Sequence, residues 1–251
     1  MLAQMMNQPL LISSLIGHAA KWHGDTEIVT RTLEGPIHRY DWRASEVRAK
    51  KFAQALARLG VEHGDRIGTI AWNTYRHVEA YYGIAGMGAV THTINPRLFP
   101  EQLEYIINHA HDQYLVIDTS FVDAVARMRD KFANVRGIIV FADKANMPCE
   151  DKLPGALCYE ELLESENGDY EWPSFDENSA AALCYTSGTT GNPKGALYSH
   201  RSTILHTLTE IAPDCMGLAA RDTVLPVVPM FHVNAWGLPY ATAAVGCKLV
   251  L

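Results

Sequence analysis

The chain has 251 residues and a formal net charge of −7, from 21 basic and 28 acidic side chains. This balance argues against a protein that coats nucleic acid, and we expect no nucleic-acid partner. The five cysteines include no C-x-x-C pair, which argues against a disulfide framework or a zinc site and favours a cytoplasmic protein.

The start of the chain carries apolar residues at helical spacing. These are Leu11, Ile12, Leu15, Ile16, Ala19 and Ala20. No positive charge precedes Lys21, so we predict an amphipathic helix packed on the body of the protein rather than a signal peptide. No apolar run reaches the ~18 residues that a membrane span requires, and we expect no transmembrane segment.

Residues 1–142 alternate between strand and helix patterns. Predicted strands lie at 27–30 and 37–40, which form a hairpin, and within 64–72, 89–94, 113–118 and 135–143. Predicted helices lie at 41–59, 75–87 and 121–132 and within 95–110. The alternation predicts a first α/β region with a mainly parallel sheet and helices on both faces.

Residues 143–179 interrupt this alternation. Between Asp143 and Glu177 the sequence has eleven acidic residues and two lysines, with several prolines and glycines. We interpret this segment as an acidic surface connection that contains one short helix near 159–163.

The alternation resumes in a second α/β region, 180–251. Strand patterns occupy 180–185, 196–200, 222–233 and 244–251, and a helix is predicted over 202–211. The chain ends at Leu251 inside an apolar run, where a strand would be left unfinished. We therefore expect that it is the N-terminal part of a longer protein, with an incomplete α/β fold.

The segment "YTSGTTGNPKG", residues 185–195, combines small hydroxyl residues, glycines and one lysine. Its hydroxyl and glycine residues include Ser187, Gly188, Thr189, Thr190 and Gly191. Glycines permit positive φ, so successive N–H groups can converge on an anion, and Lys194 adds a positive charge. The spacing fits neither the G-x-x-x-x-G-K-[ST] loop nor the G-x-G-x-x-G fingerprint. It predicts a phosphate-binding loop of another kind.

This motif resembles the phosphate-loop signature of the adenylate-forming (AMP-binding) superfamily. "GDRIGTIAWN", "NPRLFPEQLEYIINHA", "YSHRS" and "PMFHVNAWGLPYA" resemble further segments of acyl-CoA synthetases in the expected order, over essentially the whole chain. The likeness is greatest to bacterial medium- and long-chain fatty-acyl-CoA synthetases, whose close relatives use methylmercaptopropionate or other short acids. It implies the three-layer βαβ subdomains of the large N-terminal domain of those enzymes.

The resemblance implies an AMP-forming ligase of lipid metabolism. A carboxylate attacks the α-phosphate of ATP to give acyl-adenylate and pyrophosphate, and coenzyme A then displaces AMP to form a thioester. The first step brings a carboxylate to a polyanion, so Mg²⁺, N–H groups and a lysine are needed to neutralise charge. The partners implied are small molecules, namely the fatty acid, ATP and CoA, together with a second copy in a homodimer.

The resemblance also assigns roles to single residues. Ser187 to Gly191 would hold the β- and γ-phosphates with the help of Lys194, and Thr186 matches the residue associated with the metal. His232 would lie beside the acyl carboxylate and the α-phosphate, with Val233 on the same wall. Trp236 would gate the acyl tunnel. On the residues alone, a lone histidine such as His232 is more often structural, and a tryptophan in an apolar segment is usually core.

Several motifs that the superfamily needs are absent from these residues, including the later adenine, ribose and catalytic-lysine segments. We therefore expect the 251-residue chain to have no ligase activity by itself. Two alternatives stay open: an adenylating enzyme for a short, aryl or amino acid, and a catalytically silent nucleotide-binding or interaction module. The apolar character of "HVNAWGLPYA" favours fatty acyl chains over amino acids.

Overall fold

A computed structural model describes residues 1, 4–186 and 192–251 of the chain. The α-helices are α1 (Ser13–Trp22), α2 (Trp42–Arg58), α3 (Tyr75–Gly86), α4 (Pro100–Ala110), α5 (Val122–Ala126), α6 (Tyr159–Glu164), α7 (His200–Glu210) and α8 (Leu238–Val245). The 3-10 helices are η1 (Thr119–Phe121), η2 (Arg129–Lys131), η3 (Lys144–Asn146) and η4 (Val233–Gly237). The strands are β1 (Glu27–Arg31), β2 (Ile37–Asp41), β3 (Arg66–Ile70), β4 (Val90–Thr93), β5 (Tyr114–Asp118), β6 (Gly137–Phe141), β7 (Leu157–Cys158), β8 (Ala180–Thr186), β9 (Lys194–Ser199), β10 (Thr223–Val224) and β11 (Lys248–Val250).

Among the described residues, the larger sheet has seven strands in the order β7-β6-β5-β3-β4-β8-β9. Every neighbouring pair from β7 to β8 is parallel, and β9 joins the edge antiparallel to β8. β5 and β6 are buried along their whole length, because helices cover both faces of a parallel sheet. The prediction of an α/β fold with mainly parallel sheets is confirmed.

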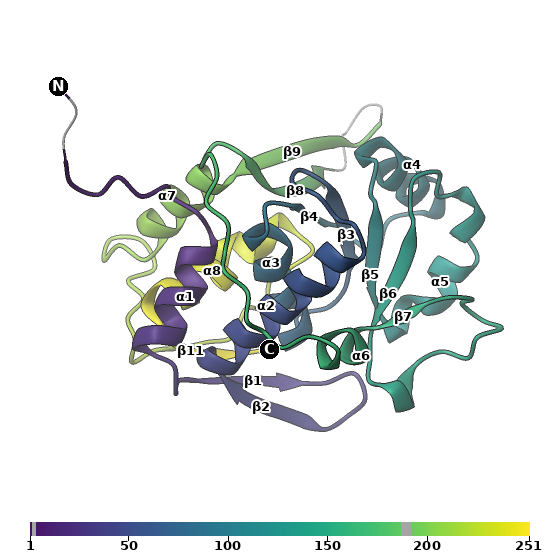
Figure 1. Cartoon of the computed structure of the whole chain (residues 1–251), viewed down its shortest axis with the longest axis horizontal. Coiled ribbons are helices and arrows are strands. Elements are labelled where there is room, and N and C mark those ends of the chain that lie inside the picture. The colour runs from purple at the N-terminus through teal and green to yellow at the C-terminus, as the bar shows by residue number, and fades with distance from the viewer. Residues whose placement is uncertain (2–3, 187–191) are drawn as a thin grey trace.

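The side chains of β5 alternate between the two helical layers. Tyr114 and Val116 pack with residues of α2 and α3, whereas Leu115 and Ile117 pack with residues of α4 and α5. Figure 1 shows α2 and α3 in front of this sheet and α4 beside its other face. The region is therefore a three-layer α/β/α sandwich, as the sequence predicts.

The smaller sheet joins the two ends of the chain. Its strand order among the described residues is β10-β11-β1-β2, in which β1 lies parallel to β11 and antiparallel to β2. Ile28 pairs with Leu249, so the last strand lies against one of the first (Figure 1). Both sheets contain strands from either side of the acidic segment 143–179, and the three-way division of the chain stays a prediction.

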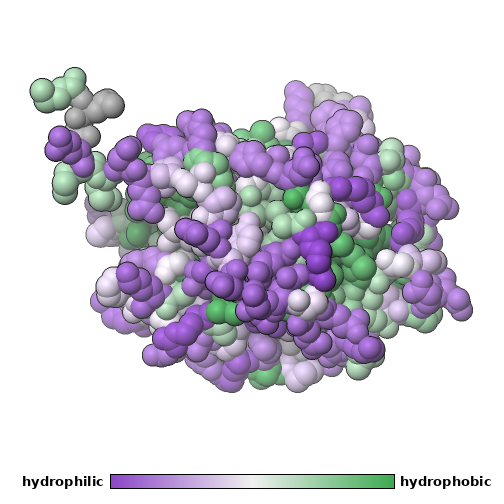
Figure 2. Space-filling view, viewed as in Figure 1, coloured by the Kyte–Doolittle hydropathy of each residue, from purple (hydrophilic) through white to green (hydrophobic). Residues whose placement is uncertain are grey.

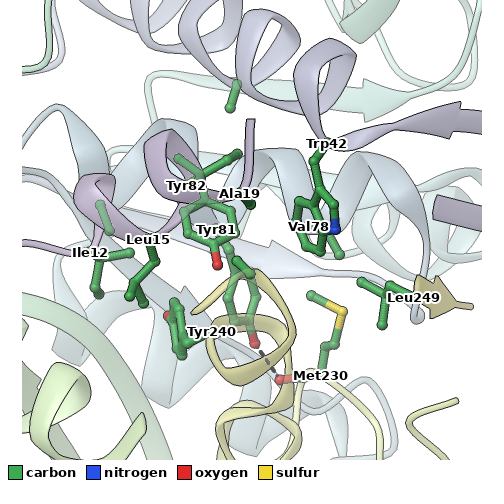
Figure 3. Packing of buried hydrophobic residues seen from close by; sticks show 14 of the residues in the cluster. Ile12, Leu15, Ala19, Trp42, Val78, Tyr81, Tyr82, Met230, Tyr240 and Leu249 are labelled. Carbon is green, nitrogen blue, oxygen red and sulfur yellow. Dashed lines mark hydrogen bonds between the residues drawn. The ribbon is translucent and has the colours of Figure 1, made fainter. Parts of the chain in front are cut away.

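A tyrosine-rich core fills the space between the sheets. Tyr81 and Tyr82 of α3 and Tyr240 of α8 are almost fully buried there, together with apolar residues of α1 (Figure 3). Trp42 closes the core toward the smaller sheet, where its Nε1 donates a hydrogen bond to the Cys247 carbonyl at 3.0 Å. The predicted N-terminal amphipathic helix, packed on the body of the protein, is confirmed.

The single helix predicted over 121–132 is wrong. The segment consists of η1, the short helix α5 and η2. Asn108 of α4 donates a hydrogen bond to the Lys131 carbonyl and accepts one from Ala133 N–H, both at 2.9 Å. These bonds tie the end of the segment to α4, so its backbone does not continue as a regular helix.

Most of the face shown in Figure 2 carries hydrophilic residues, with smaller hydrophobic areas between them. None of the helices built from the described residues has the length and apolar character that a membrane crossing requires.

Candidate functional site

The phosphate motif lies on the hairpin of β8 and β9 at the edge of the larger sheet (Figure 1). Thr186 pairs with Lys194 where the two strands separate, and the Thr186 hydroxyl donates a long hydrogen bond of 3.4 Å to the Lys194 carbonyl. Both residues are exposed. The predicted phosphate ligands Ser187, Gly188, Thr189, Thr190 and Gly191 lie outside the described residues.

Tyr185 anchors the beginning of the motif to α4. Its hydroxyl lies 2.6 Å from Nδ1 of His109, and its ring lies against His92. Burial raises the pKa of Tyr185 to about 12, so the hydroxyl stays protonated in this hydrogen bond with the imidazole. Tyr185, the first residue of the motif, is therefore held in place by a side-chain hydrogen bond as well as by the sheet.

The predicted strand over 222–233 is wrong, because only Thr223–Val224 is a strand. Pro226 and Pro229 have no N–H to donate to a ladder. Asn73, in the loop before α3, holds this irregular segment instead. Its Nδ2 donates to the carbonyls of Pro226 and Val228 at 2.9 and 3.1 Å, and its Oδ1 accepts from Met230 N–H at 2.7 Å.

The residues after His232 form a left-handed turn. Val233, Asn234, Ala235 and Trp236 have φ values of 47°, 50°, 50° and 58°. For residues other than glycine this conformation costs about 1–2 kcal/mol each, since Cβ crowds the next carbonyl oxygen. Such strain tends to concentrate at functional sites. Gly237, the residue that caps the start of α8, follows with φ of 88°, a backbone conformation that favours glycine.

Asn234 holds the turn from inside the protein. Its Oδ1 lies 3.3 Å from Tyr81 Oη, 3.4 Å from Thr93 Oγ1 and 3.3 Å from Cys184 Sγ, and each of these groups can donate. Tyr81 Oη also donates to the Met230 carbonyl at 2.5 Å, which Figure 3 shows as a dashed line. The turn is thereby tied to α3, β4 and β8.

A cavity of about 470 Å³ lies between this turn, β9 and α7. Its lining residues are Tyr198, Ser202, Thr203, His206, Val233, Asn234, Trp236, Gly237 and Tyr240. The predicted acyl-wall residues Val233 and Trp236 are among them, with exposed fractions of 41% and 55%. His232 is exposed and is not among them.

Several cavity residues were missed by sequence reasoning. Tyr198 belongs to β9, the second strand of the phosphate-motif hairpin, and His206 belongs to α7. Both lie in segments whose sequence indicates only a strand and a helix, so no local signal points to a cavity. Tyr198 shows that the hairpin and the left-handed turn contribute to the same cavity.

Within the described residues, no group of three or more His, Cys, Asp or Glu side chains could hold a metal ion. A magnesium ion bound with a nucleotide needs few protein ligands, because phosphate oxygens and water complete its coordination. The exposed hydroxyl of Thr186 suits one oxygen ligand of that kind.

Comparison with known proteins places this arrangement in a family. A family model described as AMP-binding enzyme matches residues 17–251. The chain belongs to the AMP-binding enzyme family. It is 53% identical over 251 residues to a 3-methylmercaptopropionyl-CoA ligase of Ruegeria lacuscaerulensis and 51% identical to a medium-chain-fatty-acid–CoA ligase of Ectopseudomonas oleovorans. Each match covers 100% of this chain and 46% of the relative.

Solved structures share the fold of this AMP-binding chain. An anthranilate CoA ligase in complex with anthranoyl-AMP matches with a TM-score of 0.86 at 22% identity, over 100% of this chain and 46% of the other. A long-chain-fatty-acid-CoA ligase of Archaeoglobus fulgidus matches with a TM-score of 0.84 at 24% identity, over 98% and 48%. The chain spans about half the length of the curated relatives it matches.

Proposed function

We propose that the chain is the N-terminal part of an AMP-forming ligase that joins an aliphatic carboxylic acid to coenzyme A. One observation carries the proposal: the phosphate-motif hairpin and the strained turn that bears Val233 and Trp236 line one cavity. An enzyme in which a carboxylate attacks the α-phosphate of ATP and displaces pyrophosphate needs both substrates in one site. The CoA-ligase names of the relatives over the whole chain support it.

ATP would bind at the end of the hairpin. The exposed Lys194 ammonium would neutralise phosphate charge there, and the Thr186 hydroxyl would give one oxygen to Mg²⁺. When bound, Mg²⁺ supplies the positive charge that lets a carboxylate approach the triphosphate. The roles of Ser187 to Gly191 as phosphate ligands remain part of this proposal.

The acid would occupy the cavity with its carboxylate toward His232, whose exposed imidazole can donate a hydrogen bond to the developing acyl-phosphate. Trp236 would close the cavity as a gate. Its indole is 55% exposed and belongs to a strained turn, so it is not held in place by close packing. A second candidate acid is a short thioether acid, which the name of the 53% identical relative favours.

The proposal is tested by pyrophosphate release from ATP and hexanoate with Mg²⁺, using the protein that contains this chain and the sequence that follows it in the gene. Lys194→Ala should reduce kcat/KM by about 100-fold or more, the loss expected for one preorganised charge contact. The matched control is Lys144→Ala, whose side chain is 84% exposed and paired with Glu161 on another surface. No release with any carboxylic acid would refute the ligase function.

The 251-residue chain alone should release no pyrophosphate above the level of its Lys194→Ala variant. A silent nucleotide-binding module would instead bind ATP in the longer protein without turnover. The proposed homodimer is checked by size-exclusion chromatography with light scattering, and the proposed cytoplasmic location by fractionation of the source cells.

A further inference from the structure

Glu210, the last residue of α7, is a buried carboxylate whose hydrogen bonds are missing. Its side chain is 3% exposed. Within the described part of the chain, neither Oε1 nor Oε2 has a hydrogen-bond partner. Burying such a group without a partner costs several kcal/mol, on the order of 2–7 for a neutral polar group and more for a charge. A buried carboxylate without hydrogen-bond partners therefore needs an explanation. A ligand that binds to it would provide one.

The carboxylate lies against the wall of the cavity. A Cβ atom placed on Gly237 would stand 2.8 Å from Glu210 Oε2 and 3.0 Å from His206 Nδ1. Gly237 and His206 both line the cavity. Glu210 itself is not a lining residue, but its carboxylate lies beside these two residues that are.

The neighbours of Glu210 leave its hydrogen-bonding capacity open. His206 Nδ1 is 3.7 Å from Oε2, which is too long for a hydrogen bond, and a single imidazole nitrogen can serve only one of the two oxygens. Tyr240, another lining residue, is 1% exposed, and among the described residues its hydroxyl also has no partner. Burial raises the pKa of Glu210 to about 7, so either protonation form offers an acceptor oxygen near neutral pH.

We infer that Glu210 recognises the end of the acid that lies opposite to the activated carboxyl group. The substrates are carboxylic acids with a hydrogen-bond donor at that end, either a hydroxyl or an ammonium group. This inference rests on the proposed ligase function. A methyl end would leave the buried carboxylate unpaired, whereas a donor restores its bond, and sites built to bond a polar group discriminate strongly against analogues that lack it.

The test compares hexanoate, ω-hydroxyhexanoate and ω-aminohexanoate as substrates of the longer protein that contains this chain. We expect kcat/KM for pyrophosphate release to favour a donor-bearing acid over hexanoate by at least about tenfold. Glu210→Leu should abolish or reverse this ratio. Glu210→Gln should keep the preference for the hydroxyl, because an amide oxygen also accepts, and lose any preference for the ammonium.

The matched control is Glu164→Leu, an exposed glutamate that also ends a helix, α6, and it should leave the ratio unchanged. If all acids react and Glu210→Leu does not alter the ratio, the inference is overturned and the ligase function stands. If Glu210→Leu does not fold, as judged by circular dichroism, Glu210→Gln decides.

If no acid releases pyrophosphate, the ligase function fails, and titration calorimetry of the same acids decides the inference. Tighter binding of a donor-bearing acid that is lost in the Glu210 variants would support it. Equal binding of the three acids, or none, would overturn it.

Discussion

Replacing Asn73 by alanine should release the irregular segment that leads to His232. The substitution removes the hydrogen bonds to the Pro226 carbonyl, the Val228 carbonyl and Met230 N–H. At about 1 kcal/mol net for each bond, the free energy of unfolding should fall by roughly 3 kcal/mol. For a domain of this size the melting temperature should fall by about 6–12 °C.

The assay is thermal unfolding followed by near-ultraviolet circular dichroism. Asn134→Ala is the matched control, because Asn134 is also an asparagine with a side-chain bond, but that bond is exposed to solvent. It should change stability by no more than about 0.5 kcal/mol. If the two variants lose equal stability, Asn73 does not hold the segment.

Asn73→Asp separates the role of the Asn73 side chain as a hydrogen-bond donor from its role as an acceptor. The aspartate keeps an acceptor for Met230 N–H but turns a charged oxygen toward the carbonyl oxygens of Pro226 and Val228. At neutral pH it should destabilise the protein at least as much as alanine does. Acidification should restore part of the stability, since a protonated carboxyl group can donate again. A loss that does not depend on pH would contradict this interpretation.

Two further predictions concern stability. Burial lowers the pKa of His77 and of His200 from 6.5 to about 4, so the unfolded chain binds more protons between these values. The contribution of each neutral histidine to the free energy of unfolding should therefore be fully present above pH 6.5. It should decrease toward pH 4 by about 1.4 kcal/mol per pH unit for each histidine. In urea unfolding at several pH values, the free energy of unfolding of His77→Gln should depend less steeply on pH than that of the unmodified protein. An identical pH dependence would exclude His77 as a cause. Val233→Gly should raise stability by up to about 1 kcal/mol, because relief of left-handed strain exceeds the added chain entropy. A clear loss of stability in the same urea assay would mean that Val233 is not strained.

The larger sheet was predictable because its strands are short continuous apolar runs between helical segments. β5 is such a run, and its residues are buried on both faces. The left-handed turn was not predictable. Valine, alanine and tryptophan disfavour positive φ, and only Asn234 and Gly237 are residue types that favour the left-handed backbone found there. Local pattern fails at this turn because tertiary contacts, not intrinsic preference, set its backbone.

The candidate site was predictable only in part, for a related reason. The motif at 185–195 marks a phosphate loop by composition, but the cavity is assembled from β9, α7 and η4. Tyr198 and His206 are unremarkable in a strand and a helix. Glu210 follows the pattern of an ordinary surface glutamate at a helix end, but its buried side chain lies beside Gly237, which is outside the strand predicted over 222–233.

The phosphate motif and the acyl wall are connected through one oxygen atom, Oδ1 of Asn234. Thr93 and Cys184 lie at the carboxyl ends of β4 and β8, and Cys184 precedes Thr186 by two residues. The distances from Oδ1 to these groups, 3.3–3.4 Å, are long, so each bond is weak. The turn that they hold stores strain of about 1–2 kcal/mol for each left-handed residue. The Asn234 side chain therefore links the turn that carries the acyl wall to β8, the strand that leads into the phosphate motif.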